Sequence, residues 1–304
     1  MGQRVIIPHK RDFKFEYGVP DVLSPLIRRV IAENPSPFTF RGTGTFIVGH
    51  GDVAVIDPGP LDEKHIDAIL AATKGENITH IFITHTHSDH SPNTQLLKPA
   101  TGATTYGYGQ HGKDRGLQIG DGNGDYDFQP DVLLKDGDII RGKTWSLEAV
   151  HTPGHASNHL CYALKENNVL FSGDHVMGWS TTVVSAPDGD MGSYIRSLEK
   201  LLKRDETRYW PNHGTFIDKP HAYVKKLIAH RRDREKQISA HLEKGIESVE
   251  MLVAEMYKGL DPRLYRGACR AVHAHLVHMV ETKRALCHGK LEETDRFTPP
   301  GGMK

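Results

Sequence analysis

Short hydrophobic runs, rich in β-branched and aromatic residues, alternate with turns of Gly, Pro and Asp between Phe38 and about Trp210. Runs of this kind are typical of β-strands, and the turn residues mark where each strand ends. The strands predicted in this way are Thr45–Val48, Val53–Ile56, Ile78–Thr84, Trp145–Val150, His159–Leu164 and Val169–Ser172.

Two stretches between these strands, Asp62–Ala72 and Met191–Lys203, repeat their apolar residues at intervals of three and four. That spacing places the apolar side chains on one face of a helix, which can then pack on a sheet. Strands mixed with such helices indicate a layered α/β domain. The segment Thr101–Gln129 is polar and rich in glycine, and we expect it to form a long surface loop of the kind that borders a site.

The hydrophobic pattern changes after Pro220, where longer helical patterns follow one another. Three helices are expected, at His221–Lys244, Ile246–Tyr257 and Pro262–Ala285, with charged residues on their outer faces. At about 150 residues a domain, a chain of 304 residues fits two domains. We therefore expect one domain over residues 1–220 and a second, mainly helical one over residues 221–304.

The composition excludes several classes of protein. Lys and Arg number 38, as do Asp and Glu, so the formal net charge is zero, which argues against coating of nucleic acid or membrane by bulk electrostatics. No stretch approaches the ~18 apolar residues of a membrane span, and the N-terminal residues lack the apolar core of a secretory signal. The three cysteines form no CxxC pair, as is typical of reduced thiols. We therefore expect a cytoplasmic protein without a membrane segment.

The clearest chemical signal is a histidine cluster directly after the predicted strand Ile78–Thr84. The chain contains 20 His, the side chain most often used as a metal ligand. In an extended backbone, residues two apart point to one side, so His85 and His87 can bind the same ion. A turn would then bring Asp89 and His90 to a second position beside the first. Imidazoles packed this tightly would repel one another when protonated and need a compensating partner.

Further metal ligands must come from elsewhere, because four groups cannot complete two zinc sites. Three other segments offer suitable side chains after an apolar or aromatic run. They are His151–His155, Ser172–His175 and Pro211–Gly214, with the sequences HTPGH, SGDH and PNHG.

In their order and approximate separations, the motifs HTHSDH, HTPGH, FSGDH and PNHG resemble those of the metallo-β-lactamase superfamily. The resemblance covers the chain up to about Lys219. It implies a four-layered αββα sandwich with a metal site at one edge, where loops from both sheets meet. The residues that follow resemble the winged-helix-like C-terminal unit of β-lactamase-like protein 2 and its bacterial relatives.

Carried over residue by residue, the superfamily pattern implies a site for two divalent metal ions. The first would be held by His85, His87 and His155 and the second by Asp89, His90 and His213, with Asp174 bridging the two. Asp57, in the first motif of the superfamily, would support the HTHSDH loop through hydrogen bonds. His159 would lie behind the metal ligands, and His151 and His175 are candidates for the same supporting or structural role.

The same resemblance implies a hydrolase in which a hydroxide that bridges the two metals attacks the substrate, with Asp89 fixing that hydroxide and accepting its proton. Zinc is the expected metal, and iron and manganese are the alternatives. A bridging carboxylate at Asp174 matches glyoxalase II-like thioesterases and the phosphodiesterase and nuclease branches better than it matches true β-lactamases. We therefore expect hydrolysis of a small-molecule ester, thioester, lactone or other acyl substrate, and β-lactam hydrolysis is disfavoured.

Other functions stay open. An animal member of the β-lactamase-like protein 2 group is regarded as a single-strand RNA endonuclease, and cations on the C-terminal helices could grip RNA. These cations are Lys225, Lys226, Arg231, Arg232, Arg234, Lys236, Arg263, Arg266 and Arg270. The same helices could instead cover the edge of the active site or form a homodimer. A binding module without catalysis is disfavoured, because every ligand position holds a competent residue.

A second set of histidines lies near the C-terminus, at His273, His275 and His278. Residues two apart on a helix diverge by roughly 200°, so only the last two share a face. We expect packing or surface roles for all three.

Overall fold

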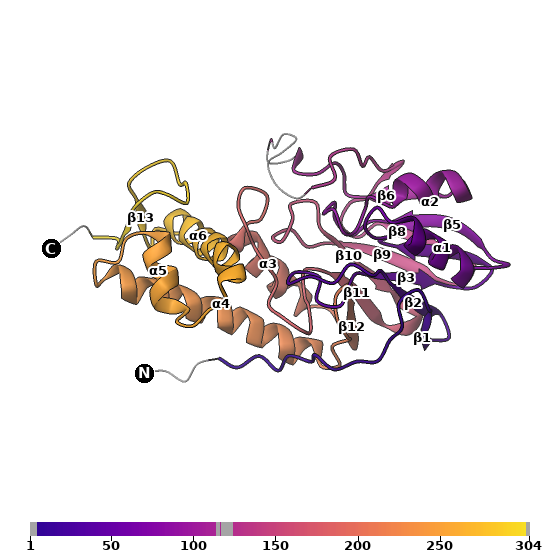
Figure 1. Cartoon of the computed structure of the whole chain (residues 1–304), viewed down its shortest axis with the longest axis horizontal. Coiled ribbons are helices and arrows are strands. Elements are labelled where there is room, and N and C mark those ends of the chain that lie inside the picture. Colours follow the sequence, from indigo (N-terminus) through magenta and orange to yellow (C-terminus); the bar gives the residue numbers. More distant parts are fainter. Residues whose placement is uncertain (1–4, 114–115, 117–123, 302–304) are drawn as a thin grey trace.

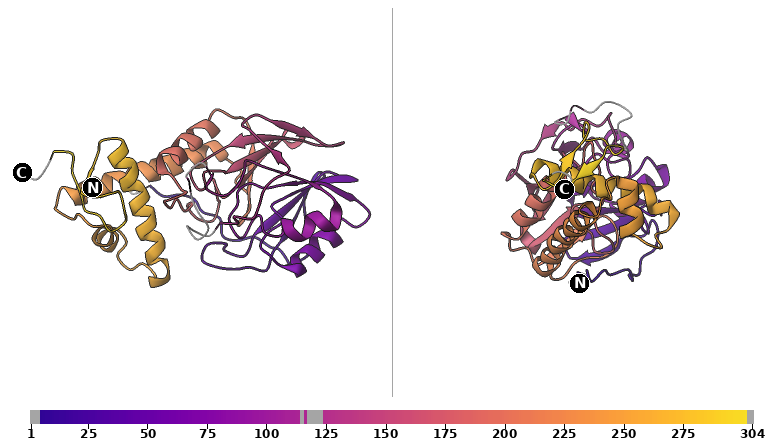
Figure 2. Two further views of the ribbon diagram at one scale, coloured as in Figure 1. Left: turned by 90° about the horizontal axis from the view of Figure 1, so that it is seen from above. Right: turned by 90° about the vertical axis from the view of Figure 1, so that its left-hand side faces the viewer.

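The computed structural model describes residues 5–113, 116 and 124–301. Over these residues, two large β-sheets lie face to face, helices cover both outer faces, and a helical unit extends from one end (Figure 1). The expected αββα sandwich and the mainly helical C-terminal unit are confirmed. Two further views show that this unit continues the long axis of the sandwich (Figure 2).

The strands of the first sheet follow one another in chain order. They are β1 (Asp21–Ser24), β2 (Ile27–Ile31), β3 (Gly44–Val48), β4 (Asp52–Ile56), β5 (Asn77–Phe82), β6 (Thr104–Gly107) and β7 (Val132–Leu133). Neighbours from β1 to β4 pair antiparallel, whereas β4, β5, β6 and β7 are parallel. The carboxyl ends of the parallel strands therefore share one edge of the sheet.

The second sheet has the strand order β12, β11, β10, β9, β8. The strands are β8 (Ile139–Arg141), β9 (Ser146–His151), β10 (Leu160–Leu164), β11 (Val169–Gly173) and β12 (Arg208–Pro211), with a short 3-10 helix η2 (Lys165–Asn167) before β11. The pairs are antiparallel except β11 with β12, which is parallel. The ends of β11 and β12 therefore also lie at one edge.

Both sheets bury both of their faces, and successive side chains of a strand point to opposite faces. In β3, Phe46 packs between the sheets, whereas Ile47 packs toward the helices outside. In β10, Tyr162 packs between the sheets and Cys161 packs outside. All four side chains are fully buried. Each sheet thus needs a cover on its outer face.

Four helices supply that cover. They are α1 (Glu63–Ala72) and α2 (Thr94–Thr101) on the first sheet, and α3 (Met191–Leu201) and the first part of α4 (Pro220–Leu242) on the second. Asp62 caps the N-terminus of α1, because its carboxylate accepts a hydrogen bond from the Lys64 amide at 3.0 Å, and Asp190 caps α3 in a similar way. The sequence does not predict α2, because it is short and contains Pro99.

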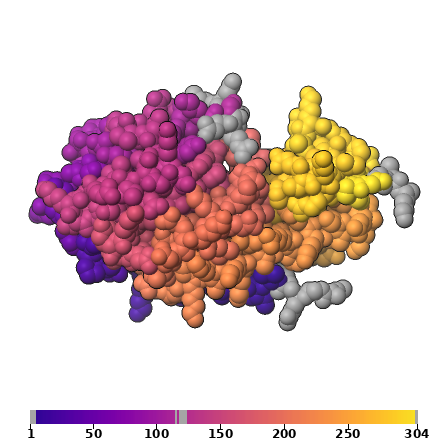
Figure 3. Space-filling view, turned by 180° about the vertical axis from the view of Figure 1, so that it is seen from behind, coloured from indigo at the N-terminus to yellow at the C-terminus, as the bar shows by residue number. Residues whose placement is uncertain are grey.

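The C-terminal unit forms a lobe on α4 (Figure 3). Beyond α4, its elements are α5 (Val249–Met256), the 3-10 helix η3 (Pro262–Leu264), α6 (Tyr265–Glu281), β13 (Leu286–Cys287) and β14 (Phe297–Thr298). Helix α4 belongs to two cores, because Leu227 packs on the sandwich and Leu242 packs in the C-terminal core. The division into residues 1–220 and 221–304 therefore stays a prediction.

Three further expectations can be compared with the structure. Among the helices of the described residues, none is long and apolar enough to cross a membrane. Cys161, Cys269 and Cys287 are free thiols, and the first two are buried. The expected loop Thr101–Gln129 contains strand β6, and its residues 114–115 and 117–123 lie outside the described part of the chain.

Candidate metal centre

The predicted metal ligands lie on loops at one edge of the sandwich, and each loop follows a strand. The HTHSDH loop, residues 85–90, comes shortly after β5. His155 lies between β9 and β10, Asp174 directly follows β11, and His213 follows β12. The two sheets thus bring together side chains that are far apart in the sequence.

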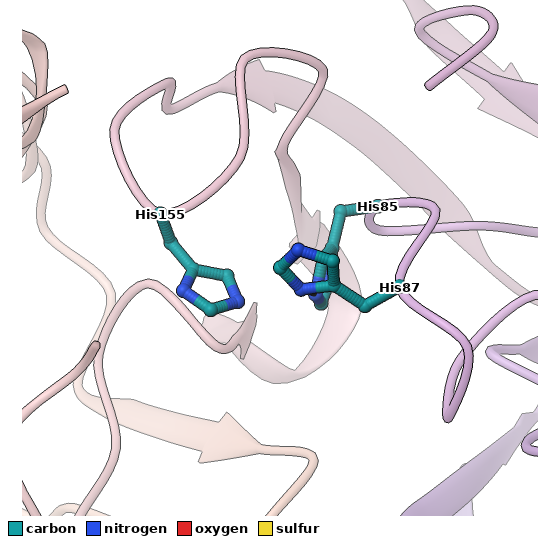
Figure 4. A group of neighbouring side chains, drawn as sticks. All are labelled: His85, His87 and His155. Carbon is teal, nitrogen blue, oxygen red and sulfur yellow. Dashed lines mark hydrogen bonds between the residues drawn. The ribbon is translucent and has the colours of Figure 1, made fainter. Parts of the chain in front are cut away.

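The first group consists of His85, His87 and His155, with one nitrogen of each ring within 4.8 Å of the others. His85 Nε2 and His87 Nδ1 are 2.9 Å apart. Figure 4 shows His85 and His87 on one loop and His155 opposite them on another, with the three rings gathered around one space. Three imidazoles in this arrangement can hold one ion and leave a coordination position open.

The second group consists of Asp89, His90 and His213, again with ligand atoms within 4.8 Å of one another. Asp174 lies between the groups. Its Oδ1 is 3.4 Å from His213 Nε2 and 3.7 Å from His90 Nε2, while its Oδ2 is 3.7 Å from His155 Nε2. One carboxylate therefore faces both groups, as a bridging ligand must.

The ring nitrogens that point away from the centre are held by the protein. His90 Nδ1 donates to Asp57 Oδ2 at 2.9 Å, and His155 Nδ1 donates to the Val183 carbonyl at 2.6 Å. His213 Nδ1 donates to the Gly42 carbonyl at 3.2 Å. Such bonds orient each ring with its Nε2 toward the centre, where a bound metal can take the place of the Nε2 proton.

Asp57 directly follows β4 and is fully buried. Besides the bond from His90, its Oδ1 accepts the Thr84 amide at 2.7 Å and its Oδ2 accepts the Thr84 hydroxyl at 2.6 Å. The Thr84 hydroxyl oxygen is in turn 3.0 Å from His85 Nδ1. One carboxylate therefore supports both the beginning and the end of the HTHSDH loop.

The other three histidines near these motifs lie behind or beside the cluster. His159 Nε2 accepts the Asp174 amide at 3.2 Å, and its Nδ1 is 2.9 Å from Thr152 Oγ1. His175 is buried with its ring edge against Tyr194, and His151 stacks on Tyr108. Among the described residues, none of the three belongs to a group that could hold a metal.

The surroundings of the cluster lower the pKa of some of its imidazoles and raise the pKa of others. Burial, together with the neighbouring imidazoles of His90 and His87, holds the pKa of His85 well below its usual range. Burial alone would lower the pKa of His213, but the carboxylates of Asp174 and Asp89 outweigh it and raise the pKa to about 10. Burial would likewise raise the pKa of Asp174, but the imidazoles of His213 and His90 hold it well below its usual value. The carboxylates are therefore ionised at neutral pH.

A second observation, the lack of partners for buried ligand atoms, also indicates that these residues fit a metal. His90 Nε2, His155 Nε2 and Asp174 Oδ1 are buried and, among the described residues, have no hydrogen-bond partner. Buried polar atoms are nearly always satisfied in folded proteins. Metal ligation would satisfy all three atoms at once.

A pocket of about 460 Å³ opens over the cluster. Its wall includes Phe38, His111 and Arg270, none of which the superfamily motifs identify. His111 is 2.9 Å from Thr86 Oγ1 and comes from the glycine-rich loop that the sequence predicts to border a site. Arg270 comes from α6, so the C-terminal unit contributes to the pocket.

Two of the six cations that the sequence predicts on α4 are not available to an RNA. Arg231 and Arg234 are buried. Arg231 donates to the Thr182 carbonyl, and the Arg234 guanidinium lies 4.6 Å from the centre of the Tyr257 ring. Both side chains thus serve packing, and exposure is confined to the other cations of this helix: Lys225, Lys226, Arg232 and Lys236.

Comparisons with known proteins agree with this geometry. The profile described as the metallo-beta-lactamase superfamily matches residues 39–213, and that of the beta-lactamase associated winged helix domain matches residues 248–293. The chain is 31% identical to the atrochrysone carboxyl ACP thioesterase AgnL7 of Paecilomyces divaricatus in an alignment 231 residues long, which covers 74% of this chain and 68% of that protein.

Two solved structures are also similar. The metallo-beta-lactamase family protein TTHA1429 from Thermus thermophilus superposes with a TM-score of 0.75 at 20% identity, covering 91% of this chain and 99% of that one. The protein TTHA1623, solved in a di-iron-bound form, gives a TM-score of 0.50 at 25% identity, covering 62% of this chain and 93% of that one. On its profile match and its thioesterase relative, the chain belongs to the metallo-β-lactamase superfamily, whose members are mostly hydrolases, and it carries the associated winged-helix domain.

Proposed function

We propose that the protein is a binuclear metal-dependent hydrolase that cleaves thioesters or related esters of small acyl substrates. The observation that carries this proposal is the pair of ligand groups with the Asp174 carboxylate between them. The thioesterase relative supports a thioester as the substrate class.

We assign one ion to His85, His87 and His155 and the other to Asp89, His90 and His213, with Asp174 shared. When bound, two divalent ions in such a site lower the pKa of a water molecule and polarise the substrate carbonyl. Imidazole and carboxylate ligands favour zinc and also suit iron or manganese. Zinc is our first choice, and the di-iron-bound relative supports iron as the alternative.

Asp89 is the residue that we expect to position the attacking water and accept its proton. Its carboxylate lines the pocket and keeps a side-chain exposure of 21%, so it can reach a bound substrate. Burial would raise its pKa, but the imidazole of His90 and the hydrogen bond from His213 hold the pKa well below its usual range. The group is therefore ionised at neutral pH, and its oxygens can accept hydrogen bonds from the attacking water.

The pocket wall suits an acyl group. Its apolar part is formed by Phe38, Met177, Val183, Ala186 and Pro187. Pockets of this size with an apolar lining and a few polar groups are typical of small-molecule sites. The acyl chain would lie along this wall with its carbonyl over the His–Asp cluster.

Closer kinship with the β-lactamase-like protein 2 group, and with it cleavage of single-stranded RNA, stays a prediction. Burial of Arg231 and Arg234 weakens the case for RNA. Among the described residues, no observation favours a homodimer.

The proposal is tested by metal analysis followed by parallel assays of a thioester, a lactone, a bis-aryl phosphodiester and a single-stranded RNA. We expect about two metal ions per chain and the highest kcat/KM on the thioester. His87→Ala and Asp174→Ala should abolish hydrolysis and lower the metal content together.

Matched controls are His50→Ala and Asp67→Asn, which change exposed residues outside the cluster. Both should keep full activity and metal content. Full activity in either cluster variant, or RNA as the best substrate, would contradict the proposal.

A further inference from the structure

Arg270 stands out in the pocket over the metal cluster. Among the described residues that line this pocket, it is the sole Lys or Arg, and the floor consists of His87, Asp89, Asp174 and their neighbours. It is also the one lining residue from the C-terminal unit. The Arg270 side chain therefore borders the space that a substrate would occupy.

The Arg270 side chain is exposed and, within the described part of the chain, forms no ion pair or hydrogen bond. Arg263 on η3 differs, because it pairs with Asp261 at 2.6 Å. Asp188 also lines the pocket, where its Oδ2 accepts the Ser157 amide at 3.1 Å and its Oδ1 is buried without a hydrogen-bond partner among the described residues. It lies beyond ion-pair distance of Arg270, so the guanidinium donors are available.

Helix α6, which carries Arg270, packs against the sandwich at two places. At Gly192 of α3, an added Cβ would lie 3.0 Å from His278 Cδ2 of α6, so these helices are in close contact. At Gly267, one turn before Arg270, an added Cβ would lie 3.9 Å from the Phe38 ring on the pocket rim. The backbone of Arg270 therefore has a defined position over the pocket.

A guanidinium presents planar, forked donors that match a carboxylate or a phosphate better than any neutral group. We propose that Arg270 binds an anionic group of the substrate, a carboxylate or phosphate separate from the scissile bond, and so selects charged acyl substrates over neutral ones. This inference rests on the proposed acyl hydrolysis. It makes the winged-helix unit part of substrate recognition at the metal site.

The test compares wild type, Arg270→Gln, Arg270→Lys and Arg266→Gln on three thioesters. Butyryl-N-acetylcysteamine is neutral, glutaryl-N-acetylcysteamine adds a carboxylate to the acyl part, and butyryl-coenzyme A adds phosphates to the thiol part. Arg266 is the matched control, because it is exposed on the same helix and does not line the pocket.

We expect Arg270→Gln to raise KM about tenfold for whichever anionic thioester the site selects, with kcat and the neutral thioester unchanged. Arg270→Lys should recover part of the loss, and Arg266→Gln should behave as wild type. The glutaryl and coenzyme A arms distinguish a carboxylate from a phosphate. An equal effect on all three thioesters, or the same effect from Arg266→Gln, would overturn the inference.

Binding of glutarate and of inorganic phosphate to the metal-free protein gives an independent measurement by titration calorimetry. Binding of one of these probes that Arg270→Gln weakens supports the anion site even when wild type cleaves no thioester, a result that would reject only the proposed function. Equal binding to both proteins, or no binding to wild type, would reject the role of Arg270.

Discussion

At the scale of single residues, the candidate centre depends on a carboxylate that faces no metal position. Asp57 accepts the Thr84 amide, the Thr84 hydroxyl and His90 Nδ1, and it is completely buried. Its bond to His90 orients the ring toward the centre, and its bonds to Thr84 hold the residue next to His85. A substitution of Asp57 would therefore disturb the orientation of metal ligands without removing any of them.

Asp57→Asn should lower metal affinity about 10- to 100-fold, because an amide cannot accept all three hydrogen bonds. Competition with a chromophoric chelator measures this affinity. The control Asp67→Asn changes an exposed carboxyl on α1 and should leave affinity unchanged. Unchanged affinity in Asp57→Asn would show that the loop is held by its other contacts.

The ligand candidates could be found from sequence because they stand in short motifs after strands. His111 could not, because its position opposite Thr86 depends on the path of a glycine-rich loop that has no periodic pattern. Arg270 is present in the sequence as one of several helix cations. Its place in the pocket depends on how α6 packs against α3, which no local pattern encodes.

At the scale of elements, the loop that carries His155 is fixed by its packing on α3. Asp190 donates its amide to the Gly154 carbonyl at 2.8 Å, and Ser197 Oγ donates to the Pro153 carbonyl at 2.8 Å. Gly154 has φ +143°, and an added Cβ would lie 2.6 Å from Tyr194 N. The close approach of loop and helix therefore requires a residue without a side chain.

Gly154→Ala should move His155 away from the other ligands and lower both stability and metal content. The cost should exceed the ~1 kcal/mol typical of alanine at a positive φ, because the clash is with backbone. Gly245→Ala provides the comparison, since Gly245 has φ +78° and no atom within 4 Å of an added Cβ. Urea unfolding and metal analysis should show a larger loss of stability and of metal content in Gly154→Ala than in Gly245→Ala. Equal losses in the two variants would contradict the packing argument.

The six strands predicted from hydrophobic runs lie within two residues of observed strands, whereas the hydrophobic pattern does not predict β1, β2, β6, β7, β8, β12, β13 or β14. Strand β2 explains why. It contains Arg28 and Arg29 within a largely buried segment. Arg29 is tolerated because Asp21 pairs with it at 2.8 Å and the Gly214 carbonyl accepts a hydrogen bond at 2.9 Å. Those partners come from tertiary structure, so the strand has no sequence signature.

At the scale of the whole molecule, α4 and α6 are joined by a buried polar cluster around Glu235. Glu235 Oε1 lies 2.8 Å from His278 Nδ1 and 3.3 Å from His275 Nδ1. Glu235 Oε2 accepts a hydrogen bond from Arg284 at 2.5 Å. These contacts agree with the expected packing role of the C-terminal histidines. Burial alone would raise the pKa of Glu235, but the hydrogen bonds from His275, His278 and Arg284 hold it well below its usual range.

Glu235→Gln should destabilise the fold by about 2 kcal/mol at neutral pH, because three donors lose an ionised acceptor. A carboxyl whose pKa is lowered by folding stabilises above its unfolded pKa of about 4.3, and this contribution is lost as the pH falls below that value. The difference from wild type should therefore shrink in thermal unfolding between about pH 7 and pH 3.5. Glu281→Gln, at an exposed position of α6, is the control. A difference that does not change with pH would contradict the role of the charge.

Because α4 is shared by two cores, the order in which the chain is synthesised matters for its folding. All strands of both sheets are made before α4 begins at Pro220. Until then, apolar residues on the outer face of the second sheet, such as Val150 and Leu170, lack the cover that α4 provides, and Ala274 of α6 completes the same cluster later still. On the ribosome, the catalytic sandwich therefore stays incomplete until most of the winged-helix domain has emerged.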